Sequence, residues 1–179
     1  MAYNPPVFEA QFPIVKEFVY HLVYYRALGA AYSRHQLKSE FWAATINAHL
    51  IRAVIVWCMV FGSDSSDIHW KRLSDKTPAK FRAGFYKGLE QRTGFDKLRW
   101  ERLRKQMTDF RNKFVAHHEL IDPLPVVPLL DGALDVVYFY DNWVRKVITP
   151  AFVEPLLKAS AERIKKDVTP LIERFMSLG

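Results

Sequence analysis

The sequence contains a single cysteine, Cys58, among 179 residues. One cysteine excludes an intramolecular disulfide framework and a CxxC zinc site, and it is typical of a protein in a reducing compartment. The chain also lacks a G-x-x-x-x-G-K-[ST] phosphate loop and a G-x-S-x-G nucleophile elbow. These absences exclude P-loop nucleotide hydrolysis and serine-hydrolase chemistry of the elbow type.

Targeting signals and long apolar runs are missing as well. The N-terminal stretch MAYNPPVFEAQFP lacks the basic-then-apolar layout of a signal peptide. No apolar run approaches the ~20 residues that a membrane-spanning helix needs. We therefore expect a cytoplasmic protein without a membrane partner.

Glycine is scarce, with seven residues, whereas half of the chain is hydrophobic and includes 13 Phe and 8 Tyr. Long periodic stretches rich in Ala, Leu, Lys, Glu, Arg and Phe favour helices over short strands. The length favours one domain with a sizeable core. The sequence therefore predicts an all-α fold, a compact bundle of about five to six helices in a single domain that spans residues 1–179.

Capping and periodicity signals divide the chain into expected helices. Residues 1–12 are predicted to form an extended leader. Ser39 is suited to cap the start of the second helix, and Gly62 stands where that helix would stop. Gly84 and Gly88, four residues apart, would allow a close helix contact. The expected helices cover residues 14–32, 40–61, 78–94, 96–116 and 134–146, with a proline-rich break over 120–133 and a last amphipathic segment that reaches residue 178.

The formal net charge of +7 favours a polyanionic partner such as nucleic acid. On the expected helix 96–116, a line of basic side chains repeats every seven residues and drifts only about 20° per step; it consists of Lys97, Arg104, Arg111 and His118. Beside it runs an apolar stripe of Leu103, Met107, Phe110, Phe114 and Ile121. A partner could bury the stripe while a phosphate meets the charges. A solvated helix face with arginine stems lying over the core would have the same spacing.

The stretch DFRNKFVAHH, residues 109–118, places two adjacent histidines after this line. On a regular α-helix His118 lies about 20° from Arg111, whereas His117 lies about 120° from it. Either the helix ends or distorts at Ala116, or His118 is the working partner, or the site combines two protomers. The ordinary alternative is that the histidines cap the end of the helix.

The string R-N-x(4)-H, here Arg111, Asn112 and His117, resembles the signature motif of the HEPN superfamily. In that motif an arginine followed by a polar residue precedes a histidine by four to six intervening positions. The surroundings resemble the abortive-infection (AbiU-like) branch of the superfamily. There, RNKFVAHH follows an amphipathic helix, and an upstream helix ends in an aromatic residue and FG before a short polar loop, as WCMVFGSDSSDIHW does here.

The resemblance implies a helical bundle that dimerises through the motif helix and, in active members, cleaves RNA without a metal. By position, Arg111 would bind and stabilise phosphate, His117 would transfer protons, and Asn112 would orient the phosphate or the histidine. His118 would be a further substrate contact or a cap of the helix end. The residues that would guide the RNA are Lys97, Arg104 and Lys113.

The resemblance also implies no cofactor, a homodimer, and an antitoxin or other regulator on a separate chain. Some members carry a modified tyrosine two places after the histidine, but Glu119 and Leu120 stand there in this sequence, so that control is not expected. Many members are catalytically silent and bind a partner protein or nucleotide, which is the alternative function. Unrelated helical DNA binding is a third possibility, although no recognition helix stands out. The family register favours His117 as the catalytic histidine, and the helical wheel favours His118.

The remaining polar side chains favour structural roles. Asp64, Asp67 and His69 lie in a polar loop without the spacing of a closed metal site, so we interpret them as turn and cap residues. His21 and His49 each lie inside an apolar stretch and are predicted to be hydrogen-bonded core residues. No metal site is expected.

Overall fold

The computed structural model describes residues 3–74, 78–116, 127–147 and 153–177, with the backbone alone for residues 114–116. Within these ranges the chain forms six α-helices, a short 3-10 helix and a π-helical turn, and it forms no strand. The predicted all-α fold is therefore confirmed. The elements are α1 (Pro5–Arg34), α2 (Glu40–Phe61), the 3-10 helix η1 (Trp70–Leu73), α3 (Pro78–Thr93), α4 (Lys97–Phe110), the π-helix η2 (Arg111–Ala116), α5 (Leu130–Val147) and α6 (Leu157–Met176).

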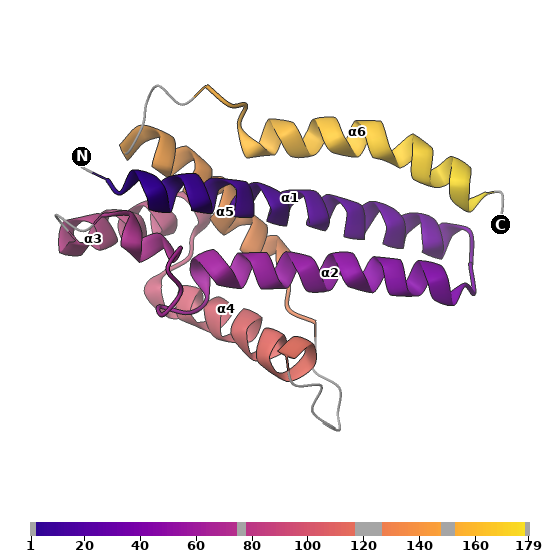
Figure 1. Cartoon of the computed structure of the whole chain (residues 1–179), viewed down its shortest axis with the longest axis horizontal. Coiled ribbons are helices and arrows are strands. Elements are labelled where there is room, and N and C mark those ends of the chain that lie inside the picture. Colours follow the sequence, from indigo (N-terminus) through magenta and orange to yellow (C-terminus); the bar gives the residue numbers. More distant parts are fainter. Residues whose placement is uncertain (1–2, 75–77, 117–126, 148–152, 178–179) are drawn as a thin grey trace.

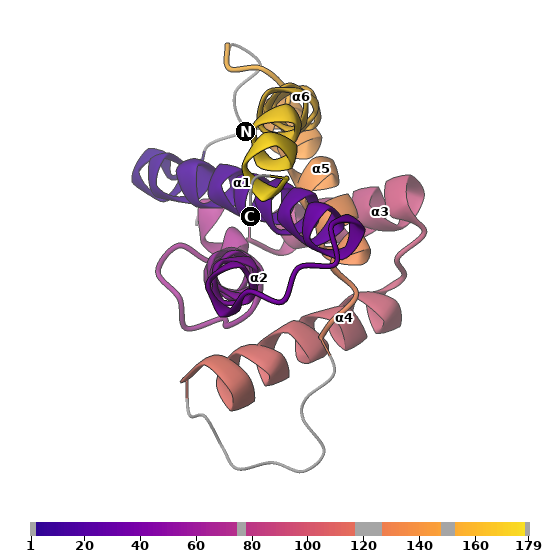
Figure 2. The same cartoon turned by 90° about the vertical axis from the view of Figure 1, so that its right-hand side faces the viewer.

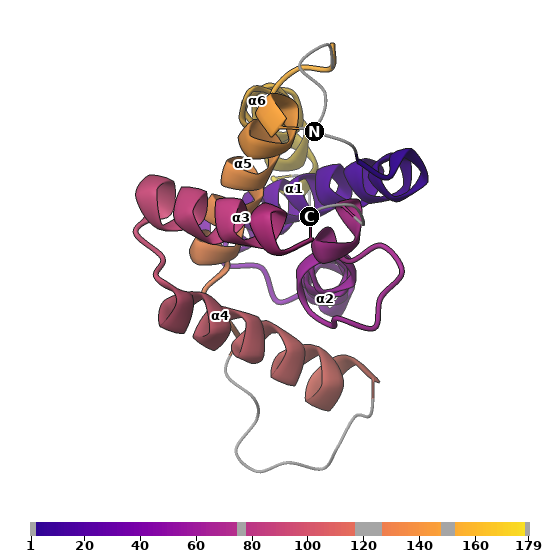
Figure 3. The same ribbon diagram turned by 90° about the vertical axis from the view of Figure 1, so that its left-hand side faces the viewer.

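The two longest helices, α1 and α2, lie side by side and run in opposite directions (Figure 1). Helix α6 follows α1 on the side away from α2, whereas α3, α4 and α5 gather at the end of the molecule where α1 begins. The two end-on views place α4 beyond α2, on the side opposite α6 (Figures 2 and 3). The helix that carries the motif is therefore an outer element of the bundle.

The core where these helices meet is aromatic. Phe61 of α2 makes edge contacts with Trp100 of α4 and Tyr140 of α5, at ring centroid distances of 6.3 and 5.1 Å. Trp57 lies 5.9 Å from Trp100, and its indole N–H donates to the carbonyl of Ala133. Each of these aromatic rings is almost fully buried. Large rings in edge-to-face contact bury much apolar area and fix the relative positions of the helices.

The extended leader predicted for residues 1–12 is wrong from Pro5 onward, because α1 begins there. Asn4 caps the helix by accepting a hydrogen bond from the Val7 amide, at 3.4 Å. Pro5 and Pro6 occupy the first helical positions, where an amide N–H is not needed. The helix also continues through Pro13, since this first segment buries Phe8, Phe12 and Val15 against the core.

The predicted bounds of the second helix are confirmed, but Ser39 and Gly62 act at its two ends in other ways than expected. Ser39 precedes α2, but its side chain makes no capping hydrogen bond. Gly62 follows α2 with a right-handed φ of −84°, so its glycine is not needed for a left-handed turn. A Cβ at Gly62 would lie 2.7 Å from the carbonyl oxygen of Cys58. The glycine is needed because the chain passes too close to α2 for any side chain.

Helix α5 begins at Leu130, four residues before the expected start. Sequence reasoning placed Gly132 in a proline-rich break, but Gly132 lies inside the helix. A Cβ on it would stand 3.0 Å from the ring of Phe95. This glycine therefore allows the close approach of the segment before α4, and it does not mark the end of a helix.

Among the described helices, α2 has the length and composition that could span a bilayer, with a mean hydropathy of 1.6 over its most apolar 18 residues. The sequence prediction that no run approaches that length therefore needs qualification. Within the molecule 44% of this stretch is buried. The buried side chains of α2 pack on α1 and on the aromatic core. Packing in the core accounts for the buried part of this stretch.

Asp141 of α5 ties α6 to the bundle. Its carboxylate is 2% exposed and accepts from the Arg145 Nε, at 2.7 Å, and from the backbone amide of Leu157 at the start of α6, at 2.8 Å. Arg145 in turn donates to the carbonyls of Glu154 and Pro155, at 2.5 and 2.9 Å. A buried carboxylate and its arginine therefore bind the backbone that leads into α6.

We predict that Asp141→Ala lowers the free energy of unfolding by about 3 kcal/mol, because it leaves Arg145 and the Leu157 amide without their buried acceptor. Chemical denaturation followed by circular dichroism measures this change. The matched control is Asp167→Ala on the exposed side of α6, which should stay within about 0.5 kcal/mol of the parent. Equal stability of the two variants would contradict the role of Asp141.

Candidate functional site

The motif lies at the end of α4, a helix with one buried side. Asp96 caps α4 by accepting from the Arg99 amide, at 2.7 Å. The predicted apolar stripe is confirmed for Leu103, Met107 and Phe110, which are buried. The side chain of Phe114 and all of Ile121 lie outside the described residues. The stripe holds α4 on the bundle and leaves the opposite side of the helix to solvent.

The α-helical hydrogen-bonding pattern ends at Phe110, and the next six residues form the π-helix η2. Sequence reasoning expected a regular helix as far as Ala116. A π-helix holds an additional residue in each turn, because its hydrogen bonds span five residues instead of four. The rotation of 100° per residue that aligned His118 with Arg111 therefore does not apply across this segment. His117 and His118 themselves lie outside the described residues.

Arg111 and Asn112 form a paired group on the π-helix. The Arg111 Nε and Nη2 donate to the Asn112 Oδ1, at 3.0 and 2.8 Å. Arg111 is half-buried, and Asn112 is exposed. In the described part of the chain no carboxylate forms an ion pair with Arg111. The amide orients the guanidinium without neutralising its charge.

The thiol of Cys58 on α2 experiences the field of Arg111. Burial raises the pKa of Cys58 to about 12, and the Arg111 charge acts in the opposite direction. The thiol is therefore protonated at neutral pH and inert, as expected for a buried cysteine. The π-helix contacts α2, which brings the Arg111 charge near this thiol.

Arg104, the middle residue of the predicted basic line, has a different environment. Its Nη1 donates to the carbonyl of Gly62, at 2.9 Å, and its Nε pairs with Glu101, at 2.8 Å. Asp64 lies 3.7 Å away from the same guanidinium. The positive charge also stands at the C-terminal end of α2, where the helix dipole favours it. Arg104 therefore fastens α4 to the end of α2.

The other predicted RNA contacts are on the surface. Lys97 is the first residue of α4, and Lys113 lies on the π-helix; both are exposed. Lys113 borders a shallow cavity of about 370 Å³ together with Asp109, Phe110 and residues 127–129. The structure therefore brings Arg111, Asn112 and Lys113 together on the π-helix, and places Lys97 at the far end of α4.

The polar loop after α2 has the structural role expected from the sequence. His69 caps η1, because its Nδ1 accepts from the Lys71 amide at 3.4 Å. Asp64 pairs with the Lys71 Nζ, at 2.7 Å, and lies 3.4 Å from the His69 Nε2. Burial lowers the pKa of His69 to about 4. No group of three or more His, Cys, Asp or Glu side chains in the described residues could hold a metal ion.

The histidines of the first two helices form a pair. The Nδ1 atoms of His21 and His49 lie 2.8 Å apart, so one ring donates to the other. Glu17 lies 3.5 Å from the His21 Nε2 and also binds Arg52. Both rings are half-buried, and burial lowers the pKa of each. The prediction of hydrogen-bonded histidines is confirmed, although they lie at the edge of the core.

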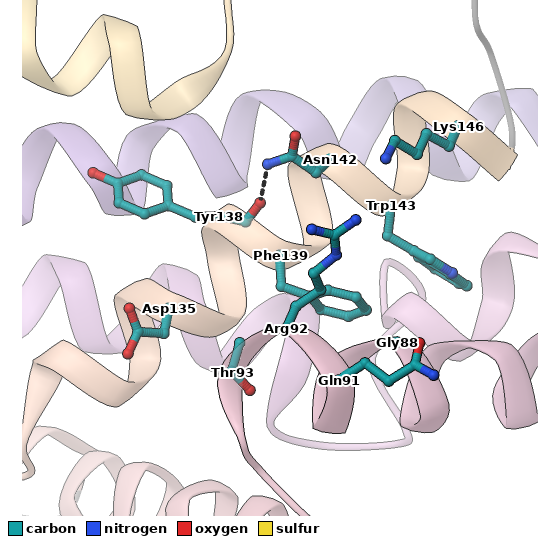
Figure 4. A pocket seen from close by; sticks show the side chains of 10 residues that line it. All are labelled: Gly88, Gln91, Arg92, Thr93, Asp135, Tyr138, Phe139, Asn142, Trp143 and Lys146. Carbon is teal, nitrogen blue, oxygen red and sulfur yellow. Dashed lines mark hydrogen bonds between the residues drawn. The ribbon is translucent and has the colours of Figure 1, made fainter.

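Sequence reasoning missed a hollow of about 510 Å³ between the end of α3 and one side of α5 (Figure 4). Aromatic, charged and amide side chains from the two helices line it, together with Gly88: Gln91, Arg92, Thr93, Asp135, Tyr138, Phe139, Asn142, Trp143 and Lys146. The Gly84 and Gly88 pair was the available signal. Gly88 does make the expected close helix contact, since a Cβ there would lie 2.9 Å from the Phe139 ring. A Cβ at Gly84 would meet no atom within 4 Å.

We predict that Arg104→Ala destabilises the fold by about 2 kcal/mol, because the Gly62 carbonyl and Glu101 lose a charged partner. Thermal or denaturant unfolding measures this loss. Arg102→Ala is the matched control, since Arg102 is exposed on the same helix and forms no ion pair among the described residues. If the two variants are equally stable, Arg104 does not fasten α4.

We also predict that the protein loses stability in mild acid through His69. An unfolded histidine titrates near 6.5, whereas folding lowers the pKa of His69 to about 4, so the unfolded state binds more protons between these values. The contribution of His69 is complete above pH 6.5 and is lost as the pH falls towards 4, by about 3 kcal/mol.

The test compares the free energy of unfolding against pH in the parent and in His69→Asn. The amide oxygen of asparagine can still accept from the Lys71 amide but does not titrate. The variant should show a smaller loss between pH 7 and pH 4, while His21 and His49 contribute equally in both proteins. Parallel curves would exclude His69 as the source.

Comparison of the chain with protein-family models, with curated proteins and with solved structures gave no match. The likeness to the HEPN superfamily therefore depends on the residues of the motif and its surroundings, and the assignment of a function depends on the geometry around Arg111.

Proposed function

We propose that this protein is a HEPN-like, metal-independent endoribonuclease, a toxin or phage-defence effector that cleaves RNA at a site shared by two protomers. Arg111 binds the scissile phosphate, Asn112 orients the guanidinium, and His117 or His118 moves the protons. The observation that carries the proposal is the state of Arg111. It is half-buried and held by a neutral amide, and in the described residues it has no carboxylate to neutralise it.

The chemistry is a transesterification within the RNA. The 2′-oxygen forms a bond to the neighbouring phosphorus, and the bond from phosphorus to the 5′-oxygen breaks. A neutral histidine accepts the proton of the 2′-hydroxyl, and an imidazolium donates a proton to the departing 5′-oxygen. The products are a 2′,3′-cyclic phosphate and a 5′-hydroxyl. The guanidinium stabilises the negative charge that develops on the phosphoryl oxygens.

A homodimer supplies the second histidine. One histidine in one protomer would have to act as base and acid in turn, whereas a two-fold axis brings two motifs to one cleft. The position of α4 at the outside of the bundle supports this arrangement, because the motif helix is accessible to a second copy. The π-helix is a further support, since such segments are frequent at functional sites.

The RNA-guiding role is assigned to Lys97, Arg111 and Lys113, in line with the net charge of +7. Arg104 is the exception, because its guanidinium already binds Gly62 and Glu101. Lys97 and Lys113 are exposed and form no ion pair in the described part of the chain. Each is therefore available for a phosphate contact.

The test is cleavage of a labelled RNA pool by the purified protein in excess chelator. The expected result is cleavage with cyclic phosphate ends, a loss of 10²-fold or more in Arg111→Ala, and a similar loss in one of the single variants His117→Ala and His118→Ala. The magnitudes are on the order of those for one lost electrostatic or proton-transfer group.

Arg102→Ala is the control, since it removes a positive charge from α4 outside the motif. All variants must keep the helical circular dichroism and the dimer mass of the parent. Parent activity that survives in Arg111→Ala and in both histidine variants would contradict the site. No cleavage by the parent above a mock preparation would favour the catalytically silent HEPN module that binds a partner protein or nucleotide.

A further inference from the structure

One wall of the hollow between α3 and α5 is aromatic, and buried phenylalanines hold it in place. Trp143 lies 4.6 Å from Phe81 and 5.5 Å from Phe85, measured between ring centroids. Phe139 lies 6.2 Å from Trp143 with an angle of 28° between the rings. Because Phe81 and Phe85 are fully buried, the half-buried Trp143 is held in place. A planar ligand would therefore meet a rigid aromatic surface.

Gly88 makes this wall possible. A Cβ at this position would lie 2.9 Å from the Phe139 ring and 3.8 Å from the Trp143 ring. Any side chain on Gly88 would therefore displace Phe139 and narrow the hollow. The volume of about 510 Å³ lies within the range of small-molecule sites.

Three charged side chains border the hollow. Arg92 is in the last turn of α3, and Lys146 is in the last turn of α5. Asp135 lies on α5 about three turns before Lys146 (Figure 4). None of the three forms an ion pair among the residues that the structure describes. Two cations and one carboxylate leave the hollow with a net positive charge.

We propose that this hollow is a binding site for an aromatic phosphate, a planar ring joined to a phosphate dianion. The ring would pack on Trp143, and the phosphate would lie between Arg92 and Lys146. Asp135 would accept a hydrogen bond from an N–H or O–H group of the ligand. Two cations suit a dianion better than the single carboxylate of an aromatic amino acid. Nucleoside monophosphates and simple aryl phosphates share this chemistry.

The site is separate from the motif. Thr93 ends α3 at the hollow, and the 14 residues of α4 then extend about 21 Å before Arg111. The proposal depends on the geometry of α3 and α5 alone, and it does not require that the protein cleaves RNA. A ligand could therefore bind here in a variant whose motif is inactive.

The experiment is titration calorimetry of the full chain at pH 7.5, where the phosphate is a dianion. The probes are adenosine and uridine 5′-monophosphates and phenyl phosphate. Adenosine lacks the phosphate, inorganic phosphate lacks the ring, and tryptophan is a zwitterion. We expect binding of the aromatic phosphates, and at least tenfold weaker binding of the three comparison compounds. Stronger binding of a nucleotide than of phenyl phosphate would identify nucleotides as the source.

Charge-reversal variants locate the binding. Arg92→Glu and Lys146→Glu should each weaken binding at least tenfold, whereas Lys166→Glu on the exposed side of α6 should not. All three positions are exposed, so the fold should be retained. Equal weakening in Lys166→Glu would show non-specific attraction and would overturn the proposal. Binding of the probes to Arg111→Ala at parental affinity would separate this site from the motif.

Tryptophan fluorescence provides an independent readout. Trp57, Trp70 and Trp100 are at most 1% exposed, so a bound ring can reach only the half-buried Trp42 or Trp143. In a Trp42→Phe background, an aromatic phosphate should quench the emission with the affinity found by calorimetry. Absence of binding by both methods, or quenching that requires Trp42, would overturn the proposal.

Discussion

The aromatic contact between α2, α4 and α5 is the constraint on which the remaining arrangement depends. Phe61 lies against both Trp100 and Tyr140, so the end of α2 fixes the start of α4 and the middle of α5 together. Tyr140 also donates to the Gln11 side chain of α1, at 2.5 Å. Four helices are thereby set relative to one another by rings with few rotamers. The edge contacts between rings are directional, which is how a core with so much aromatic surface can specify one arrangement.

This constraint gives the basic side chains of α4 and of the π-helix different environments. Because Trp100 and Leu103 face the core, Arg104 emerges beside the end of α2 and its charge is used inside the protein. Arg111 lies two turns further on, past the end of the regular helix, and among the described residues its guanidinium donates to the Asn112 amide oxygen. Equal spacing in the sequence thus produces two arginines with different surroundings, one bound at the end of α2 and one held by a neighbouring amide. The distinction comes from the Gly62 carbonyl and the Asp64 carboxylate that follow α2, together with Glu101 on α4 itself.

Much of the fold could be predicted because the local signals were strong. The apolar period and Gly62 were sufficient for α2, and the stripe through Leu103, Met107 and Phe110 was sufficient for the buried side of α4. The start of α1 could not be predicted from the apolar period alone, because Pro5 and Pro6 precede it and the first helical turn tolerates proline. The start of α5 was missed because Gly132 serves packing against Phe95, a contact distant in sequence. The candidate site could be predicted only in part, because no local pattern indicates the pairing of Arg104. The spacing of Gly84 and Gly88 indicates a close helix contact but not the hollow beside it.

The π-helix that carries Arg111 also affects the direction in which its own side chains point. A turn with one residue in excess can pass that residue along the helix by exchanging one hydrogen-bond partner for the next, without unfolding. Each such step rotates only the residues that the excess passes, by about 100°, the angle between neighbours on an α-helix. The rigid aromatic core determines where α4 lies, but it does not set this angle. The hydrogen-bond register at η2 therefore sets the direction of Arg111 and Asn112 separately from the packing that holds α4.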